Sequence, residues 1–178
     1  MVAALKIIVA DTSHVDVLSA IGAETFVEAY AVTLSAEDLE EYVTEAFAAE
    51  RIRDEIDRSL ATYLLCTDGG DAVCGYSKYI ATEPPGCVAA EGAIELQRLY
   101  VRDGYRGRGI GGLLARRGEA VVREQGHAAI WLQVWEGNVA AQDVYLKWGY
   151  SFCGEQMYAV GSERRKVLIM SKMLDSGG

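Results

Sequence analysis

The chain has 178 residues, of which 51% are hydrophobic and 24% charged; this composition is typical of one globular domain and excludes disordered and fibrous proteins. The net charge of −9 argues against nucleic acid as a partner, and no apolar run approaches the roughly 20 residues that span a membrane. The first residues are a poor match to a signal peptide, so we expect a cytoplasmic protein.

The charge is unevenly distributed along the chain. Residues 1–57 carry a net charge of −10, whereas residues 98–123 carry a net charge of +5. The first region could attract a cation and the second an anion, although each charge taken alone is typical of a solvated helix face. The four cysteines form no C-x-x-C pair, and there are two histidines, so we expect free thiols and no metal.

The first half of the chain predicts one strand, two or three helices and a hairpin. Residues 5–10 form a short apolar run typical of a strand, and residues 16–31 have apolar residues at helical spacing. Ser35 is a capping residue for a second helix over 35–47, and a short helix or its continuation follows over 50–60. Two strands over 62–67 and 72–80 are joined by the turn DGGD, and a loop with both prolines follows over 81–92.

The second half alternates strands and helices. Strands are predicted over 93–101 and 128–135, an amphipathic helix over 110–126, and a helix over 138–148 that Asn138 opens and Gly149 closes. Two closing antiparallel strands are predicted over 150–160 and 166–174. The pattern predicts a single α/β domain over 1–178, with a mixed, mostly antiparallel sheet of six or seven strands and about four flanking helices.

The stretch YRGRGIGG, residues 105–112, matches two phosphate-binding patterns. From Gly107 it fits G-x-G-x-x-G, the dinucleotide fingerprint, and from Arg106 it fits R-x-x-G-x-G. In both patterns, glycines let backbone N–H groups approach a phosphate at a helix N-terminus. A dinucleotide site requires a tight turn after a buried strand. Here five residues separate Val101 from Gly107, and the strand contains the polar residues Glu95, Gln97 and Arg98. The context therefore favours R-x-x-G-x-G.

The segment AIELQRLYVRDGYRGRGIGGLL resembles the central motif of the GCN5-related N-acetyltransferase (GNAT) family, and N-x-x-A-x-x-x-Y-x-x-x-G-[FY] follows from Asn138 to Tyr150. The resemblance implies the GNAT fold, acetyl-CoA as cosubstrate and no metal. It also implies a set of cofactor-binding positions: Leu99, Tyr100, Val101, Arg106, Gly107, Arg108, Gly109, Ile110, Gly111, Gly112, Asn138, Ala141, Tyr145 and Lys147.

Further segments, among them ETFVEAY, SAEDLEEYVTEAF, IWLQVWEGN and the ending G…GS…VLIMSKML, resemble the PaiA type of polyamine N-acetyltransferase over about residues 5–174. Val167 departs from that pattern, which has an acid before LIM. The resemblance implies a small cationic amine such as spermidine or spermine as acceptor. Alternatives are a protein N-terminus, an amino acid or an antibiotic as acceptor, a non-catalytic CoA-binding module, and a dinucleotide-binding protein.

The resemblance implies that Tyr145 protonates the CoA sulfur, since a phenol with a pKa of about 10 is protonated at neutral pH. Glu95 is a candidate base, directly or through water, or else a partner for Arg98. The acceptor candidates are the acidic and aromatic residues Glu24, Glu28, Tyr30, Glu41, Tyr42 and Glu45, foremost Glu28, Tyr30, Glu41 and Tyr42. The expected partner is a small-molecule amine, with neither nucleic acid nor membrane, and a homodimer is a family-level expectation.

Overall fold

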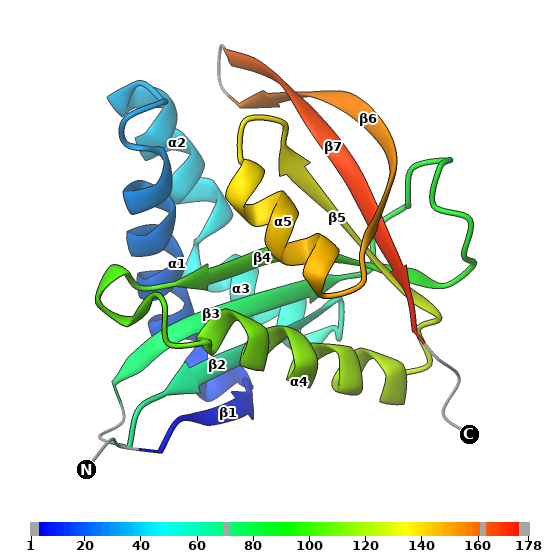
Figure 1. Ribbon diagram of the computed structural model, residues 1–178. Coiled ribbons are helices and arrows are strands. Elements are labelled where there is room, and N and C mark those ends of the chain that lie inside the picture. Colours follow the sequence, from blue (N-terminus) through cyan, green and yellow to red (C-terminus); the bar gives the residue numbers. More distant parts are fainter. Residues whose placement is uncertain (1–3, 70–71, 161–162, 175–178) are drawn as a thin grey trace. The chain divides into compact units, whose positions relative to one another are not determined.

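The computed structural model describes residues 4–69, 72–160 and 163–174, and its strands form one seven-stranded sheet (Figure 1). The order across the sheet is β1-β2-β3-β4-β5-β7-β6. The strands are β1 (Lys6–Val9), β2 (Ala61–Thr67), β3 (Val73–Ile80), β4 (Ala93–Val101), β5 (Ala129–Trp135), β6 (Ser151–Val160) and β7 (Glu163–Met173).

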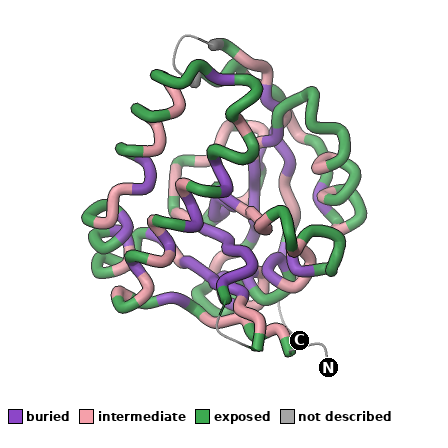
Figure 2. The backbone as a smooth tube through the Cα atoms, turned by 90° about the vertical axis from the view of Figure 1, so that its left-hand side faces the viewer, coloured by how far each residue is buried: buried purple, intermediate pink, exposed green. Residues whose placement is uncertain are grey.

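Five α-helices accompany the sheet in the described part of the chain. Along the helical coils in Figure 2, exposed and buried residues alternate with the turns, as expected for helices that bury one side. The helices are α1 (Val15–Tyr30), α2 (Ala36–Ala46), α3 (Ala49–Asp57), α4 (Ile110–Glu124) and α5 (Val139–Lys147).

The chain divides into two compact units, each built from two separate stretches. The first contains Met1–Lys78 and Arg98–Gly118, and the second contains Tyr79–Gln97 and Glu119–Gly178. The boundaries fall inside β3, β4 and α4 rather than in a linker, so these three elements contribute to both units.

The predicted α/β class with a mixed sheet is confirmed, and β4 has the predicted bounds. The pairing of β4 with β5 is parallel, whereas β1 with β2, β5 with β7 and β6 with β7 are antiparallel. The segment after α2 is a separate helix because Ala48 adopts an extended ψ of 130°. Parts of two sequence patterns, Gly70–Asp71 of the turn and Gly161–Ser162 of the ending, lie outside the described residues.

In the first unit, α1 packs closely on the end of α2. Phe47, which is 3% exposed, lies against Gly22, where an added Cβ would meet the ring at 2.3 Å. The Ser19 hydroxyl donates a hydrogen bond of 2.6 Å to the backbone oxygen of Phe47. The serine that the sequence identifies as a cap does cap α2, since the Ser35 side chain accepts from the N–H of Asp38 at 3.1 Å. These contacts determine where the aromatic residues of α1 and α2 meet.

The first unit also contains a buried ion pair. The Lys78 ammonium on β3 lies 2.9 Å from the Glu55 carboxylate on α3, and the Tyr63 hydroxyl on β2 donates to the same carboxylate. Glu55 is 6% exposed and Lys78 is 1% exposed. Burial raises the pKa of Glu55, but the hydrogen bonds from Tyr63 and Lys78 outweigh it and hold the pKa below its ordinary value. This carboxylate therefore joins α3 to two strands.

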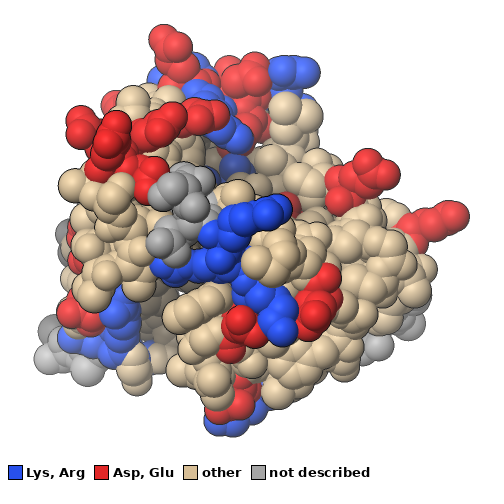
Figure 3. Space-filling view, turned by 90° about the horizontal axis from the view of Figure 1, so that it is seen from above, with Lys and Arg blue, Asp and Glu red and all other residues tan. Residues whose placement is uncertain are grey.

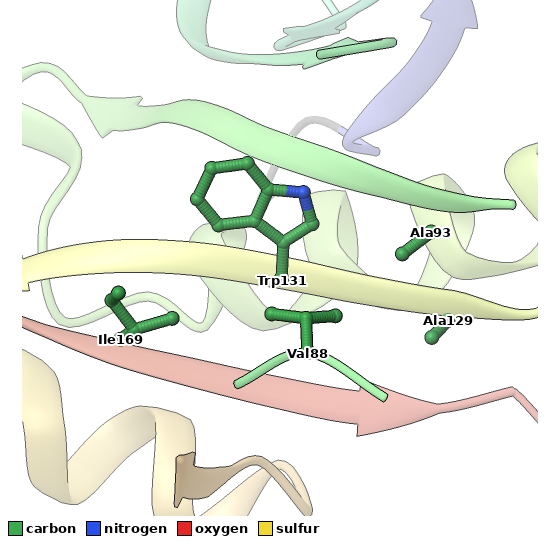
Figure 4. Close-up of a cluster of buried hydrophobic side chains, with 5 residues drawn as sticks. All are labelled: Val88, Ala93, Ala129, Trp131 and Ile169. Carbon is green, nitrogen blue, oxygen red and sulfur yellow. The ribbon is translucent and has the colours of Figure 1, made fainter. Parts of the chain in front are cut away.

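In the second unit, β5, β7 and β6 form an antiparallel sheet with a β-bulge between Phe152 and Gly154. A compact apolar cluster lies on one face of this sheet (Figure 4). Trp131 from β5 and Ile169 from β7 meet Val88 from the loop after β3, with small alanines beside them at the starts of β4 and β5. The cluster holds the proline-containing loop on the sheet.

Within residues 4–69, 72–160 and 163–174, there is no cluster of three or more His, Cys, Asp or Glu side chains that could hold a metal ion. Over the same ranges, the helices are too short or too polar to cross a bilayer.

The ion pair of Glu55 predicts a large loss of stability in Glu55→Gln. The variant leaves the Lys78 ammonium buried without its anion, and we expect the free energy of unfolding at pH 7 to fall by about 3–5 kcal/mol in urea titrations. Because the pKa of Glu55 is lowered in the fold, its contribution to stability is complete above the ordinary carboxyl pKa of 4.5 and is lost as the pH falls. Wild type and variant should therefore converge on acidification.

The control is Glu50→Gln, which changes an exposed carboxylate on the same helix and should alter stability by less than about 0.5 kcal/mol. Equal losses in the two variants would contradict a structural role for the buried pair.

Candidate active site

Strand β4 carries candidate residues on both of its faces. Glu95 and Arg98 are three residues apart, so strand alternation places their side chains on opposite faces of the sheet. Both are buried, each with 7% exposure. The parallel ladder with β5 joins Ala93–Glu95 to Ala129–Trp131, and the backbone of residues 99–101 extends beyond it.

The end of β4 lies close to β3 in the first unit. Gly75 on β3 faces it, and an added Cβ there would meet the backbone oxygen of Tyr100 at 2.7 Å. The N–H of Arg102 donates to the backbone oxygen of Cys74 at 2.9 Å. The strand is thus held at the point where the glycine loop begins.

The glycine loop has two residues in the left-handed region. Gly107 and Gly109 both have φ of +76°, a backbone conformation that is strained for residues with a side chain. Both are exposed, whereas Ile110 is 1% exposed and anchors the start of α4. The backbone oxygen of Gly109 accepts from the N–H of Leu113 at 3.1 Å, so the helix begins directly after the loop. Its first N–H groups have no partner in a preceding turn and carry the positive end of the helix dipole. This backbone can bind an anion.

The arginines of this loop make contacts within the first unit. Arg102 donates to the backbone oxygen of Val73 and to the Glu24 carboxylate, both at 2.7 Å. Arg106 donates to the backbone oxygen of Val101 at 3.2 Å and to the Asp103 carboxylate at 2.8 Å.

Arg106 also lies 3.8 Å from the Glu28 carboxylate. Arg108 donates to the backbone oxygen of Gly104 at 2.9 Å and lies over the Tyr105 ring at 5.1 Å. The arginine side chains therefore stabilise the conformation of the loop that carries them.

The carboxylate of Glu95 takes part in a polar row in the second unit. The Thr82 hydroxyl donates to its Oε2 at 2.9 Å, and the Gln133 amide donates to its Oε1 at 3.4 Å. The Gln156 amide donates to Gln133 Oε1 at 2.8 Å. Sequence reasoning missed these three partners; the available signal was a polar Gln133 within the apolar strand AIWLQVW.

Helix α5 presents the second motif. The Asn138 side chain caps it by accepting from the N–H of Ala141 at 3.2 Å. The Tyr145 ring is partly buried, edge-on to Trp148 at 5.8 Å and to Tyr150 at 5.7 Å between centroids. Lys147 is exposed. The chain turns after the helix at Gly149, with φ of +89°.

The aromatic acceptor candidates meet in the first unit. Phe26 stacks on Tyr42 at 4.3 Å and lies 4.5 Å from Tyr30. Glu41 is exposed on α2, whereas Glu28 and Glu24 are ion-pair partners of Arg106 and Arg102. The structure thus brings Tyr30 and Tyr42 together and assigns two of the acids to the glycine loop.

Arg98 is an additional residue of this aromatic cluster that sequence reasoning did not assign to it. Its guanidinium lies over the Phe47 ring at 4.4 Å and donates to the Tyr42 hydroxyl at 3.4 Å. Burial and the charge of Arg98 lower the pKa of Lys78 to about 8. A buried positive charge therefore borders the candidate acceptor residues.

By position, the candidate residues divide between the units. The glycine loop, residues 99–101 and the acceptor candidates belong to the first unit, and Glu95, Asn138, Ala141, Tyr145 and Lys147 belong to the second. Chemically, the loop backbone can hold an anion, a carboxylate can accept a proton and a phenol can donate one.

Comparison with known proteins identifies the family. The family model described as Acetyltransferase (GNAT) family matches residues 24–150, which include β4, the glycine loop and α5. An N-acetyltransferase of uncharacterised role from Lactobacillus delbrueckii subsp. lactis is 26% identical over 171 residues, covering 96% of this chain and 98% of the relative. The streptothricin acetyltransferase of Streptomyces lavendulae is 32% identical over 121 residues, covering 59% of this chain and 64% of the relative.

The fold is also found among solved structures. The PaiA N-acetyltransferase from Thermoplasma acidophilum, solved in complex with coenzyme A, superposes with a TM-score of 0.76 at 22% identity, over 96% of this chain and 99% of that one. The predicted GNAT fold is confirmed by this likeness and by the family match. The chain belongs to the GNAT family of acetyltransferases and is an N-acetyltransferase that uses acetyl-CoA as its cosubstrate.

Proposed function

We propose that this enzyme acetylates the primary amine of a small cationic acceptor, with polyamines such as spermidine and spermine as the first candidates. The observation that carries this proposal is the composition of α2. It has five acidic residues and no lysine or arginine over Ala36–Ala46. Most of these acids are exposed. Figure 3, which views the molecule from above, shows Asp and Glu side chains gathered along one edge of the face that it draws. A field of this sign raises the local concentration of a polycation.

In this proposal, backbone groups make most of the contacts with acetyl-CoA. The N–H groups of residues 107–112, at the glycine loop and the start of α4, would hold the pyrophosphate of acetyl-CoA. The backbone of residues 99–101 would pair with the pantetheine arm like an added strand, because it extends beyond the ladder with β5. The side chains of Asn138 and Lys147 complete the proposed contacts, and Arg106 supports them by bracing the loop.

The proposed reaction is direct transfer. The neutral amine nitrogen attacks the thioester carbon, the C–S bond breaks, and the amide C–N bond forms. The proton lost from the amine goes to the Glu95 carboxylate, directly or through a water, and Tyr145 donates a proton to the departing thiolate. Solvent then carries a proton from Glu95 to the Tyr145 phenolate, which restores both groups and balances the reaction.

A second class of acceptor is favoured by a different observation. The guanidinium of Arg98 contacts Tyr42, and a buried cation of this kind favours an anionic group beside it. An amine that also carries a carboxylate, such as an amino acid, would satisfy Arg98 and still present a primary amine. The similarity to the streptothricin acetyltransferase makes antibiotic amines a further candidate class of acceptor.

The proposed location is the cytoplasm. It rests on the four cysteines, which are free thiols in the structure, as is usual in a reducing compartment.

The glycine loop predicts weaker cofactor binding in Gly109→Ala. An alanine at φ of +76° costs about 1–2 kcal/mol and displaces the N–H groups beside it, so we expect the Kd for CoA to rise about tenfold by calorimetry. The matched control is Gly104→Ala, since Gly104 is also exposed and uncrowded but has no positive φ. Equal Kd values for the two variants would count against the loop as the pyrophosphate site.

The proton-donor role of Tyr145 predicts a loss of turnover in Tyr145→Phe. We expect kcat to fall about 100-fold or more, because a phenyl ring fills the same space but has no proton to donate. The Kd for CoA should stay within about twofold, and Tyr158→Phe on β6 is the control. Unchanged kcat in Tyr145→Phe would remove this residue from the chemistry, and the absence of turnover in wild type with any amine would point to a non-catalytic CoA-binding module.

The two acceptor classes are separated by matched pairs of amines. Putrescine and ornithine, and likewise cadaverine and lysine, differ by one carboxylate, so steady-state kcat/KM values compare the preferences directly. A cationic acceptor predicts higher values for putrescine, cadaverine and above all spermine, and a KM for spermine that rises with salt and in Glu41→Gln. Higher values for ornithine and lysine would favour the Arg98 contact, and activity on peptide N-termini alone would reject both.

A further inference from the structure

A row of polar side chains crosses one face of the second unit from Thr82 to Gln156. It runs from the loop after β3 through Glu95 on β4 and Gln133 on β5 to Gln156 on β6. The hydrogen bonds along it measure 2.9, 3.4 and 2.8 Å. The strand registers agree with these contacts, because Glu95 pairs with Trp131, and Gln133 lies two residues further along the same face.

The row crosses β7 without a polar residue from that strand. Val167 on β7 pairs with Gln156 on one side and with Trp135 on the other. All three residues share the face that carries Gln133, and Val167 is 7% exposed. The aliphatic side chain of Val167 has no group that competes for these amides, so Gln156 reaches Gln133 past it.

The hydrogen bonds specify how the Glu95 carboxylate is held. Thr82 donates to one oxygen and Gln133 to the other. Gln156 donates to the carbonyl oxygen of Gln133, which leaves the amide hydrogens of Gln133 directed at Glu95. Trp131, the cross-strand neighbour of Glu95, belongs to the buried apolar cluster. A flexible side chain is thereby ordered before any substrate binds.

We propose that Gln133, oriented by Gln156, and Thr82 are positioning residues that aim the Glu95 carboxylate at the acceptor amine or at a bridging water. This inference rests on the proposed role of Glu95 as the general base. Each carboxylate oxygen accepts one hydrogen bond from these donors, which fixes the direction in which the carboxylate faces. Since a misplaced base loses much of its effect, the row contributes to the rate of transfer rather than to cofactor binding.

The first measurement is the effect of Gln133→Leu on steady-state kinetics. We expect kcat to fall about tenfold, part of the about 100-fold or greater loss expected for Glu95→Gln as the base itself. The KM for acetyl-CoA should stay within about twofold in both variants. Gln156→Leu should lower kcat by a smaller factor, because Gln156 acts through Gln133.

The deciding measurement is a double-mutant cycle between Glu95→Gln and Gln133→Leu. If Gln133 acts through Glu95, the second substitution should change kcat by less than about twofold once Glu95 has been replaced. Thr82→Val, which removes the hydroxyl at the other oxygen with little change of shape, should give the same pattern. This second cycle also preserves the test if Gln133→Leu fails to fold.

The control is Gln125→Leu, an exposed glutamine just after α4 that makes none of these contacts and should leave kcat unchanged. A merely structural role for the row would lower kcat by the same factor with and without Glu95, and that additive result would overturn the inference while the base proposal stands. Full activity in Glu95→Gln would instead overturn both. Loss of activity in Glu95→Gln with none in Gln133→Leu and Thr82→Val would overturn the positioning role alone.

Discussion

The glycine loop depends on ion pairs that its own arginines make with the first unit. Arg102 joins the loop to β3 and to Glu24 on α1, while Arg106 joins it to the end of β4 and to Glu28. A loop with two residues at positive φ has many alternative conformations when unfolded, and these contacts select one of them. The consequence is an ordered loop backbone, which is the proposed phosphate site, and arginine side chains that bind other groups of the protein.

Strand β4 links this loop to the rest of the proposed chemistry. Its alternation places Glu95 among the polar donors of one face and Arg98 among the aromatic rings of the other. Both side chains are buried, with 7% exposure each, so water screens their electrostatic interactions with neighbouring groups only weakly. The proposed base and the proposed acceptor selectivity thus come from one strand of nine residues.

The sequence predicted the elements well, and the candidate site less completely. Local signals such as Ser35 before α2 and Gly149 after α5 act within one turn of chain, so the predicted helix ends agree with the structure. The partners of Glu95 come from three other segments, and their meeting depends on strand register, which no local pattern specifies. The same holds for Glu24 and Glu28. The sequence predicted that they bind the acceptor, whereas the structure pairs them with arginines of the loop.

By itself, the sequence determined the class of fold and the two motifs of an acetyltransferase, because spacing along one strand, loop or helix is enough to specify them. The tertiary structure alone decided which side chains hold Glu95, which cation lies beside Tyr42 and how the charge of the loop arginines is used. The physical reason is that hydrogen bonds and ion pairs act over a few ångströms in space, and folding brings distant residues within that range.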